Sequence, residues 1–454
     1  MPFLPTTVEI SNTNGLLSVR LLKGVGYYSD DEMFGFTHLN LNLASLPLLR
    51  NRNSVELYGE TLLNALELHA AVRKELMQLS NFPAGKPFTL GFSIMASAAA
   101  QLRWEALCYH DRSFLAENGS CILNRIAIGA APQGTELRAY TSSIKLAAFL
   151  SPSSVSSEEE FNAISEAVVS AGKTGLIIEA VIYVGEQSLL DKELERIAVG
   201  DLQGITVKPM PANALAIEAA LKNDKAQILH FFCHGHSLEG VQLLEFASIT
   251  DHDIKAARGS VTFSIERLQE CLASTGTTWL TVLNSCSGAN DVPNLFSMAA
   301  TLAKSVSPIA IGMAEPIKNI DATVFARSFY PRALQIIYEC LNDLALNCAT
   351  TIDLGPAVSH ARRALFDTAE AAEQNEPDSF SRWCLPVYYV RDPALKVMHI
   401  ADTNMKGRIE TVALALQGLP SSTPIELRDQ ILKVLANPPA IDPTLWPDRF
   451  GNLV

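Results

Sequence analysis

The amino-acid sequence predicts an α/β fold built on a doubly wound, mostly parallel sheet with helices on both faces. Two observations support this prediction. From about residue 143, short apolar runs alternate with longer segments of helical periodicity, which is the pattern of strand–helix–strand units. The chain has 454 residues and is 48% hydrophobic, with 25 Gly and 23 Pro. This composition is typical of a globular protein with a sizeable core, and the length allows two to three domains.

The alternation begins with an apolar strand over residues 144–152. A helix follows, with Ser157 as its expected N-cap and with Glu158, Glu159 and Glu160 in its first turn, where carboxylates complement the positive end of the helix dipole. Strands and helices then continue in turn over residues 176–185, 189–200, 205–211, 213–224 and 226–235.

The second part of the alternation is less even, because a longer excursion over residues 236–263 interrupts it with a strand-like segment and a polar loop. A helix over 264–275 then leads into an apolar strand over 278–286. Further helices are expected at 294–305, 322–341 and 354–371, and further strands at 308–314 and 383–390. The sequence therefore predicts six or more core strands.

The two ends of the chain follow other patterns. The first part is α+β, with strands expected at 8–12, 16–22 and 88–96 and one helix over 59–79. Near the C-terminus, residues 423–426 (TPIE) form a capping box with proline at the first helical position, and a proline-rich stretch follows the helix. We therefore predict three domains, over residues 1–136, 137–400 and 401–454.

Composition excludes several classes of function. The net charge is −13 with no basic run, which disfavours direct binding of nucleic acid, since that affinity comes from neutralising phosphates. The 8 cysteines lack CxxC spacing, so reduced thiols are expected rather than a zinc ribbon or a disulfide framework. No apolar stretch reaches the roughly 18 residues of a membrane span, and no secretory signal is evident. A cytoplasmic protein without membrane contact is expected.

Two residue types used in catalysis stand at the ends of apolar runs. His234 and Gly235 close the run ILHFFCHG, and Cys286 closes the run TVLNSC. Sites in open α/β sheets collect beyond the carboxyl ends of the strands. Cys286 lies 52 residues after His234, and a histidine about 50 residues before its cysteine is the caspase-type order.

These motifs resemble those of the CHAT family, caspase-like cysteine proteases of the caspase–separase clan that are found in bacteria. ILHFFCHG, VLNSCSGA and PIAIGMAEPIKNIDATVFARSFYPRAL carry the resemblance, which extends over about residues 7–393. It implies a caspase-like fold for residues 137–400 and a catalytically empty, pseudo-protease-like layer for residues 1–136. The chain lacks the TPR repeats of many relatives.

The predicted chemistry is nucleophilic catalysis. Cys286 would attack as a thiolate, with His234 as general base and later as the acid that protonates the leaving amine. The N–H groups of Gly235 and Cys286 would form the oxyanion hole. The clan often orients its histidine with a backbone carbonyl, so the resemblance does not require a third carboxylate.

Two other histidines compete with His234 for the role of base. Strand alternation puts His230 and His234 on one face, so alternation alone does not choose between them. His230 lies four residues deeper and is typical of a core histidine, whereas His236 stays open as an alternative base or a substrate-binding group. Zinc is disfavoured because Cys233 points to the opposite face of the strand; no metal or cofactor is expected.

Charged side chains in the loops near the predicted site are the candidates for determining substrate specificity. Glu315 directly follows the strand over 308–314, where the crevice is expected, and is the first candidate for binding a basic P1 side chain. His236 is a further candidate for substrate contact. The acidic loop residues that share this candidacy, with a solvated surface charge as the alternative for each, are Glu239, Asp251, Asp253, Asp291 and Glu315.

The sequence therefore predicts a cysteine endopeptidase that cleaves a specific protein partner. By resemblance, a sensor or scaffold protein would activate it in a bacterial defence or stress pathway. Two alternatives stay open: a catalytically silent caspase-like scaffold that serves only for interaction, and a receptor for a small ligand. The second lacks support, since no complete P-loop pattern is present.

Overall fold

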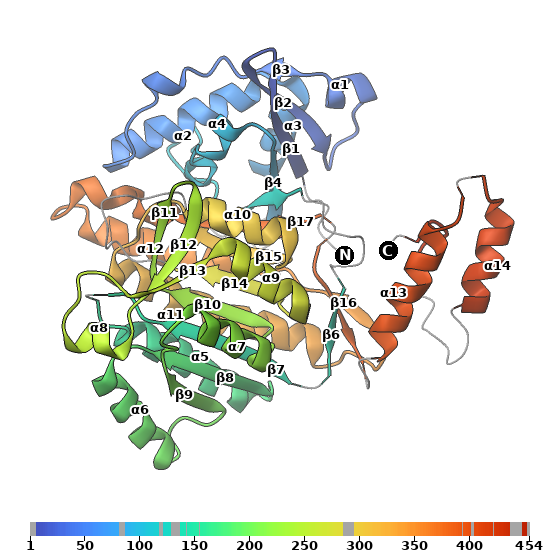
Figure 1. Cartoon of the computed structure of the whole chain (residues 1–454). Helices are drawn as coiled ribbons and strands as arrows, with labels where there is room; N and C mark the ends of the chain where they lie inside the picture. Colours follow the sequence, from blue (N-terminus) through green and yellow to red (C-terminus); the bar gives the residue numbers. More distant parts are fainter. Residues whose placement is uncertain are drawn as a thin grey trace.

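The computed structural model of the chain describes residues 6–80, 87–117, 121–128, 137–141, 143–153, 155–284, 295–392, 394–400, 404–420, 422–435 and 447–451. A twelve-stranded sheet runs through the described part of the molecule, with helices on both of its faces (Figure 1). Two three-stranded sheets lie beside it. The predicted fold class, a mostly parallel sheet between helices, is confirmed.

The order of the strands in the large sheet is β3 (Thr37–His38), β2 (Leu16–Lys23), β1 (Thr6–Thr13), β4 (Phe88–Ile94), β5 (Cys121–Ala127), β17 (Pro386–Arg391), β15 (Ile309–Met313), β14 (Leu280–Leu283), β10 (Ile228–Phe232), β7 (Ile144–Leu150), β8 (Ile178–Val184) and β9 (Ile205–Pro209). The small sheets are β11 (His234–Leu238), β12 (Val241–Phe246) and β13 (Val261–Ser264), and β16 (Ala349–Thr351), β18 (Lys396–His399) and β6 (Leu137–Tyr140).

The described helices are α1 (Asp30–Phe34), α2 (Arg52–Glu67), α3 (Ala70–Ser80), α4 (Ser97–Ala100), α5 (Glu158–Thr174), α6 (Gln187–Ala198), α7 (Ala214–Asp224), α8 (Ile249–Asp253), α9 (Ile265–Thr275), α10 (Leu295–Ser305), α11 (Asn319–Leu341), α12 (Gly355–Ala372), α13 (Asn404–Gln417) and α14 (Ile425–Leu435). None of them combines the length and the apolar character needed to cross a membrane.

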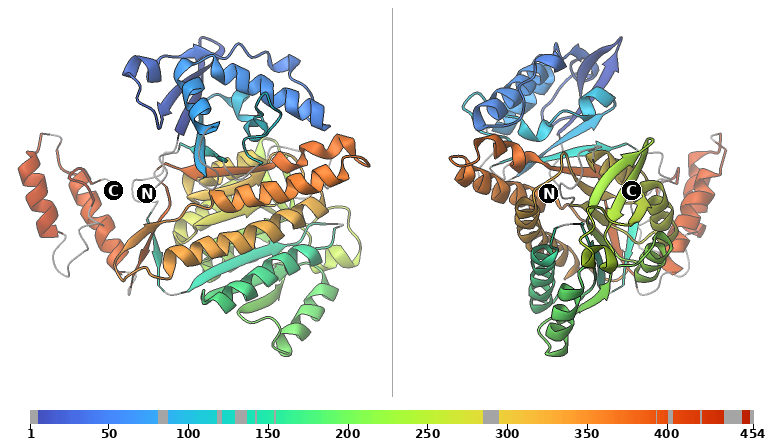
Figure 2. Two further views of the ribbon diagram at one scale, coloured as in Figure 1. Left: turned by 180° about the vertical axis from the view of Figure 1, so that it is seen from behind. Right: turned by 60° about the vertical axis from the view of Figure 1, so that its left-hand side comes forward.

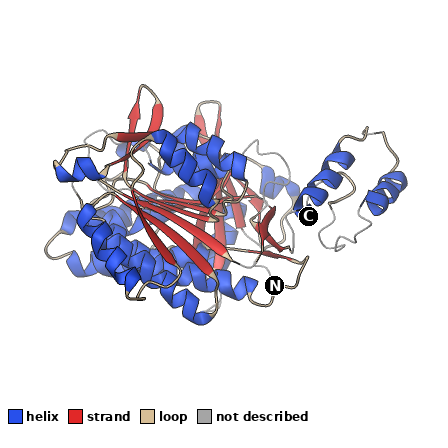
Figure 3. Cartoon of the chain, turned by 60° about the horizontal axis from the view of Figure 1, so that its bottom comes forward, coloured by secondary structure: helices blue, strands red, loops and turns tan. Residues whose placement is uncertain are grey.

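The strands β15, β14, β10, β7, β8 and β9 are all parallel, as the alternation of strands and helices predicts. They are apolar runs because helices cover both faces of the sheet. Helices α5, α11 and α12 cover one face, and α7, α9 and α10 cover the other (Figures 1 and 2). Figure 3 shows the strands between these two layers. Every residue of β10 and of β14 is buried accordingly.

The N-terminal region contributes the other end of the same sheet. Strand β1 pairs with β2 in antiparallel fashion and with β4 in parallel fashion, and β5 continues from β4. Strand β5 then pairs with β17 through Arg125 and Tyr389, so the two regions share one sheet. The domain boundary predicted at residue 136 stays a prediction, since residues 129–136 lie outside the described part of the chain.

The single helix predicted over residues 59–79 is wrong, since the structure has α2 and α3 with a break at Leu68 and His69. The reason is a capping contact: Nδ1 of His69 accepts a hydrogen bond from the backbone N–H of Val72 at 3.3 Å. The other ring nitrogen, Nε2, lies 2.9 Å from the carbonyl oxygen of Gly35. His69 therefore starts a new helix rather than continuing the first.

The C-terminal tail forms a separate small core. The helix expected after the capping box is confirmed as α14, beginning at Ile425. It lies with α13 to one side of the main sheet (Figures 1 and 2). The apolar side chains that join these helices to β6 and β18 are Leu137, Met398, Ile400, Ile409, Val412, Leu416 and Leu432.

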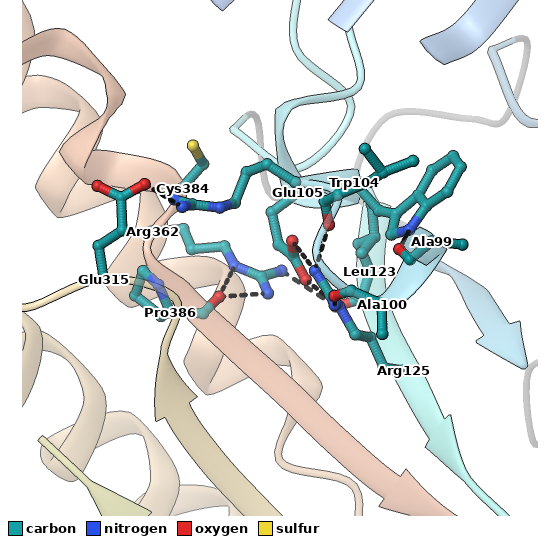
Figure 4. Close-up of polar contacts among 12 residues, drawn as sticks. Ala99, Ala100, Trp104, Glu105, Leu123, Arg125, Glu315, Arg362, Cys384 and Pro386 are labelled. Atoms are coloured by element: carbon teal, nitrogen blue, oxygen red, sulfur yellow. Dashed lines mark hydrogen bonds and ion pairs between the residues drawn. The ribbon is translucent and has the colours of Figure 1, made fainter. Parts of the chain in front are cut away.

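Charged side chains are buried where the two regions meet. Arg125 binds both carboxylate oxygens of Glu105, with Nε at 3.0 Å and Nη2 at 2.8 Å. Arg362 donates to the carbonyl oxygens of Pro386 and Leu123 (Figure 4). Burial alone would raise the pKa of Glu105, but the Arg125 guanidinium, with Arg362 nearby, holds it below its usual value. The pair is stable there because its geometry is bidentate.

Substituting Glu105→Ala should destabilise the protein strongly, because Arg125 would stay buried without its anion. Breaking a buried pair in this way costs about 3 to 5 kcal/mol. Urea denaturation measures the free energy of unfolding. The matched control is Glu179→Ala on the exposed side of β8, which should change stability by less than about 0.5 kcal/mol. Equal stability of both variants would contradict the structural role of the pair.

Candidate active site

The strands β10 and β14 are parallel neighbours, with His230 paired to Val282. Their carboxyl ends therefore meet at one edge of the sheet, where sites collect in this kind of fold. His234 starts β11 at that edge, two residues after β10 ends at Phe232. Asn284 follows β14 there, and Cys286 comes two residues later in the sequence but lies outside the described residues.

His234 is buried at this edge, with 4% of its surface exposed. Its Nε2 lies 3.0 Å from the backbone carbonyl oxygen of Ser153. A carbonyl only accepts hydrogen bonds, so Nε2 carries the proton and Nδ1 is the basic nitrogen of the neutral ring. This contact has the form that the resemblance implies, a histidine oriented by a backbone carbonyl.

The loop that carries Ser153 is held from two sides. Its neighbour Ser151 donates its backbone N–H to the carbonyl oxygen of Phe232 at 2.9 Å, and its own carbonyl accepts from the N–H of Ala247 at 2.9 Å. The hydroxyl of Ser153 donates to the carbonyl oxygen of Ala257 at 3.3 Å. Because these bonds fix the loop, the carbonyl that faces His234 is fixed as well.

Gly235 and His236 follow His234 along β11, which pairs with β12 in antiparallel fashion. Glu245 stands opposite His234 in this register, and its Oε2 lies 3.6 Å from Nδ1 of His236. Gly235 is partly exposed beside them, so its backbone is close to the edge where a substrate would lie. The assignment of Gly235 to an oxyanion hole stays a prediction, as does the alternative role of His236.

His230 is part of a buried polar network. Its ring is fully buried, with Nδ1 2.7 Å from the hydroxyl of Tyr330 and Nε2 3.0 Å from a carboxylate oxygen of Glu160. The same oxygen of Glu160 accepts a hydrogen bond from the side-chain amide of Asn284 at 2.7 Å. The side chain of His230, in β10, thus faces α5 and α11 in the interior rather than the edge where the strands end.

Sequence reasoning missed Glu160, Asn284, Tyr330 and the carbonyl of Ser153. For Glu160 a signal existed: it shares a helix face with Ile164, Ala167 and Val168, which are buried. A carboxylate on the apolar face of an amphipathic helix needs a buried partner. Its position in the sequence alone indicates only a glutamate in the first turn of a helix. No comparable pattern marks a backbone carbonyl such as that of Ser153.

The predicted acidic candidates differ in their surroundings. Glu315, labelled in Figure 4, follows β15 with 59% of its side chain exposed, and its Oε1 lies 2.7 Å from Nη2 of the buried Arg103. Glu239 is exposed at the tip of the β11–β12 hairpin, where it and Gly240 both have positive φ, 51° and 85°. Asp291 lies outside the described residues. Glu315 thus already has a cationic partner.

Asp251 has a structural role instead. It accepts hydrogen bonds from Ser248 and Ser260, and it completes the capping box of α8. Partial burial alone would raise the pKa of Asp251, but the hydrogen bonds from Ser260 and Ser248 lower it to about 2. Asp253, at the end of the same helix, is exposed.

Seven cysteines are described, and none of them forms a disulfide. Burial raises the pKa of Cys384 to about 11, and of Cys108 and Cys121 to about 12. Burial also raises the pKa of Cys233, which packs in an apolar cluster. In the described part of the chain, no three His, Cys, Asp or Glu side chains lie close enough to hold a metal ion.

Alkylation should therefore be selective in the folded protein at neutral pH. We expect iodoacetamide to label Cys286 first, as the predicted thiolate nucleophile, and the partly exposed Cys340 and Cys348 more slowly. The buried thiols should react last, because they are protonated and covered. Peptide mass mapping after timed labelling measures this order. Rapid labelling of Cys384 or Cys121 before Cys286 would contradict it. Labelling in urea is the control, since all eight thiols should then react.

Comparison with known proteins identifies the family of the chain. A protein-family model, described as the CHAT domain, matches residues 58–353, more than half of the chain. The match lies within the range over which the sequence resembles that family and includes both His234 and Cys286. No curated protein is similar enough to the chain to match it.

Proposed function

The chain belongs to the CHAT family, which is caspase-like, and from this we propose that it is a cysteine endopeptidase that cleaves a specific protein partner. The observation that carries the proposal is the position of His234. Its imidazole is buried at the strand edge and oriented by the carbonyl of Ser153, and β14, the strand that precedes Cys286 in the sequence, ends at the same edge. A purely structural histidine needs no such placement.

In the proposed reaction, the thiolate of Cys286 attacks the carbonyl carbon of the scissile peptide bond. His234 takes the thiol proton on Nδ1, while Nε2–H keeps its contact with Ser153. The N–H groups of Gly235 and Cys286 bind the oxyanion that forms. His234 then returns the proton to the leaving amine, and water hydrolyses the thioester in a second step.

The carbonyl of Ser153 has a defined part in this scheme. It fixes the tautomer of His234, so that the basic nitrogen is the one not facing the loop. The dipole of a carbonyl also stabilises the imidazolium that forms during proton transfer, without placing a second charge in the site. The loop bonds at Ser151 and Ala247 keep this dipole in place before the substrate arrives.

For specificity, we propose that acidic side chains around this edge bind a basic P1 residue, with Glu315 first and with Glu239 and Asp291 as further contacts. His236 would contact substrate from β11. Because Glu315 is paired with Arg103, a P1 cation would have to share its carboxylate with that guanidinium. This competition favours a substrate that supplies additional contacts, such as a specific partner protein.

We further propose that a sensor or scaffold protein activates the peptidase in a cytoplasmic defence or stress pathway. The net charge of −13 supports contact with any nucleic-acid complex through a protein subunit rather than directly.

Co-expression with the proteins encoded by neighbouring genes tests the activity. We expect the wild type to cut one neighbour at a discrete site, and we expect Cys286→Ala and His234→Ala to lose cleavage by at least about a thousandfold, as for other nucleophile–base pairs. Gel electrophoresis and N-terminal sequencing of the fragment measure cleavage and identify P1. Matched controls are Cys340→Ala and the exposed His360→Ala, which should cleave like wild type.

The other outcomes are equally informative. Cleavage that persists in Cys286→Ala would overturn the nucleophile assignment. If no neighbour is cut and Cys286 also fails to react with a covalent cysteine-directed probe, a catalytically silent scaffold becomes the better description.

A further inference from the structure

A carboxylate that the proposed reaction does not use is buried in the interior near the proposed site. Glu160, in the first turn of α5, is fully buried. Its Oε1 accepts a hydrogen bond from the side-chain amide of Asn284 at 2.7 Å and lies 3.0 Å from Nε2 of His230. Its other oxygen, Oε2, has no hydrogen-bond partner among the described residues.

The network continues on the far side of His230. Nδ1 of His230 lies 2.7 Å from the hydroxyl of Tyr330, which is buried in α11. Burial, together with the charge of Glu160, raises the pKa of Tyr330 well above its usual value, so the hydroxyl keeps its proton. Nε2 lies 3.0 Å from Oε1 of Glu160 but without the geometry of a hydrogen bond. The chain of contacts links α11, β10, α5 and the end of β14.

This arrangement lowers the stability of the folded protein. A buried carboxylate with one oxygen unbonded loses hydration that its partners do not fully replace. Apolar side chains of similar volume in such a place are often neutral or stabilising. The surrounding core is built from apolar side chains such as Phe161, Ile164 and Phe329. Packing alone therefore does not explain a glutamate at position 160.

What the network holds is the end of β14. The side chain of Asn284 donates to Glu160 and, at 3.2 Å, to the carbonyl oxygen of Ala322. Its backbone N–H donates to the carbonyl oxygen of Phe231 at 2.9 Å. These three bonds fix the residue that stands two positions before Cys286.

The helix that carries Glu160 is also connected to the general base. The loop between β7 and α5 contains Ser153, whose carbonyl orients His234. At the end of this loop, the hydroxyl of Ser157 donates to the carbonyl oxygen of Leu150 at 3.1 Å instead of capping the helix. The start of α5 is thus bonded to the end of β7 through Ser157 and to the end of β14 through Glu160.

We propose that Glu160 is a positioning residue of the peptidase: by holding Asn284, it sets where the chain that continues to Cys286 leaves β14 relative to His234. This inference rests on the proposed function. Glu160 touches neither substrate nor reacting atoms, so it acts through Asn284. His230 lies against its carboxylate, and the hydroxyl of Tyr330 lies against His230.

The test is the rate of alkylation of Cys286 by iodoacetamide as a function of pH, in the full-length protein, with mass spectrometry as readout. Glu160→Gln keeps the shape and removes the charge; Asn284→Asp places a second carboxylate against the first. For both variants we expect alkylation at pH 7 to be about tenfold slower, with the midpoint of the pH profile about one unit higher. Cleavage of the partner should fall in kcat rather than rise in KM.

Two further variants separate positioning from loss of folding. Tyr330→Phe removes a single hydroxyl and should fold, and we expect a smaller change in the same direction. Glu193→Gln is the matched control: Glu193 is another fully buried glutamate, in α6 and paired with Arg196, and its loss should leave the alkylation profile unchanged.

The outcomes distinguish this inference from the function on which it rests. If Cys286 of the wild type reacts faster than in His234→Ala, but Glu160→Gln and Tyr330→Phe match the wild type, the positioning role is overturned and the peptidase stands. If the wild type and His234→Ala react alike, the proposed histidine–cysteine pair is overturned, and the positioning role with it. If Glu160→Gln does not fold, the profile of Tyr330→Phe decides.

Discussion

The pairing of β5 with β17 is the contact on which the arrangement of the whole molecule depends. It joins five strands from the N-terminal region to seven strands from the rest of the chain in one sheet. Arg125 stands in this pairing and is held by Glu105. Because a strand position in a twisted sheet fixes the direction of its neighbours, this junction also sets how β15, β14 and β10 are oriented. The buried charges there therefore determine geometry as well as stability.

The position of the candidate site follows from this sheet. Strand β17 runs antiparallel to β15, whereas β15, β14 and β10 run parallel to one another. Three parallel strand ends consequently reach one edge, and the N-terminal region reaches the same place through Arg103 and Glu315. The region without the His–Cys motif thus contributes a charged contact beside the site.

The sequence was sufficient for the parallel strands and for the place of His234 after a strand, because continuous apolar runs such as residues 146–150 indicate buried strands in an α/β pattern. It was insufficient for β5, where Asn124 and Arg125 interrupt the apolar run, and for the α2–α3 break, which depends on the long-range contact of His69 with Gly35. Glu160 was interpreted from its neighbours in the sequence alone, although its partner Asn284 is distant in the chain. Cys286 and Asp291 stay predictions, since neither lies among the described residues.

A neutral group lies beside His234 and the charged group lies in the interior, and this difference has a chemical consequence. His234 is oriented by a neutral carbonyl, whereas the buried carboxylate of Glu160 accepts a hydrogen bond from Asn284 and lies against His230 in the interior. A carboxylate against His234 would stabilise the imidazolium before any substrate is bound, and it would add a fixed negative charge where the proposed reaction forms a thiolate and an oxyanion. A carbonyl orients the ring without that repulsion. Because the carboxylate of Glu160 lies in the interior, it can hold Asn284 at the end of β14 while the edge that carries His234 stays free of its charge.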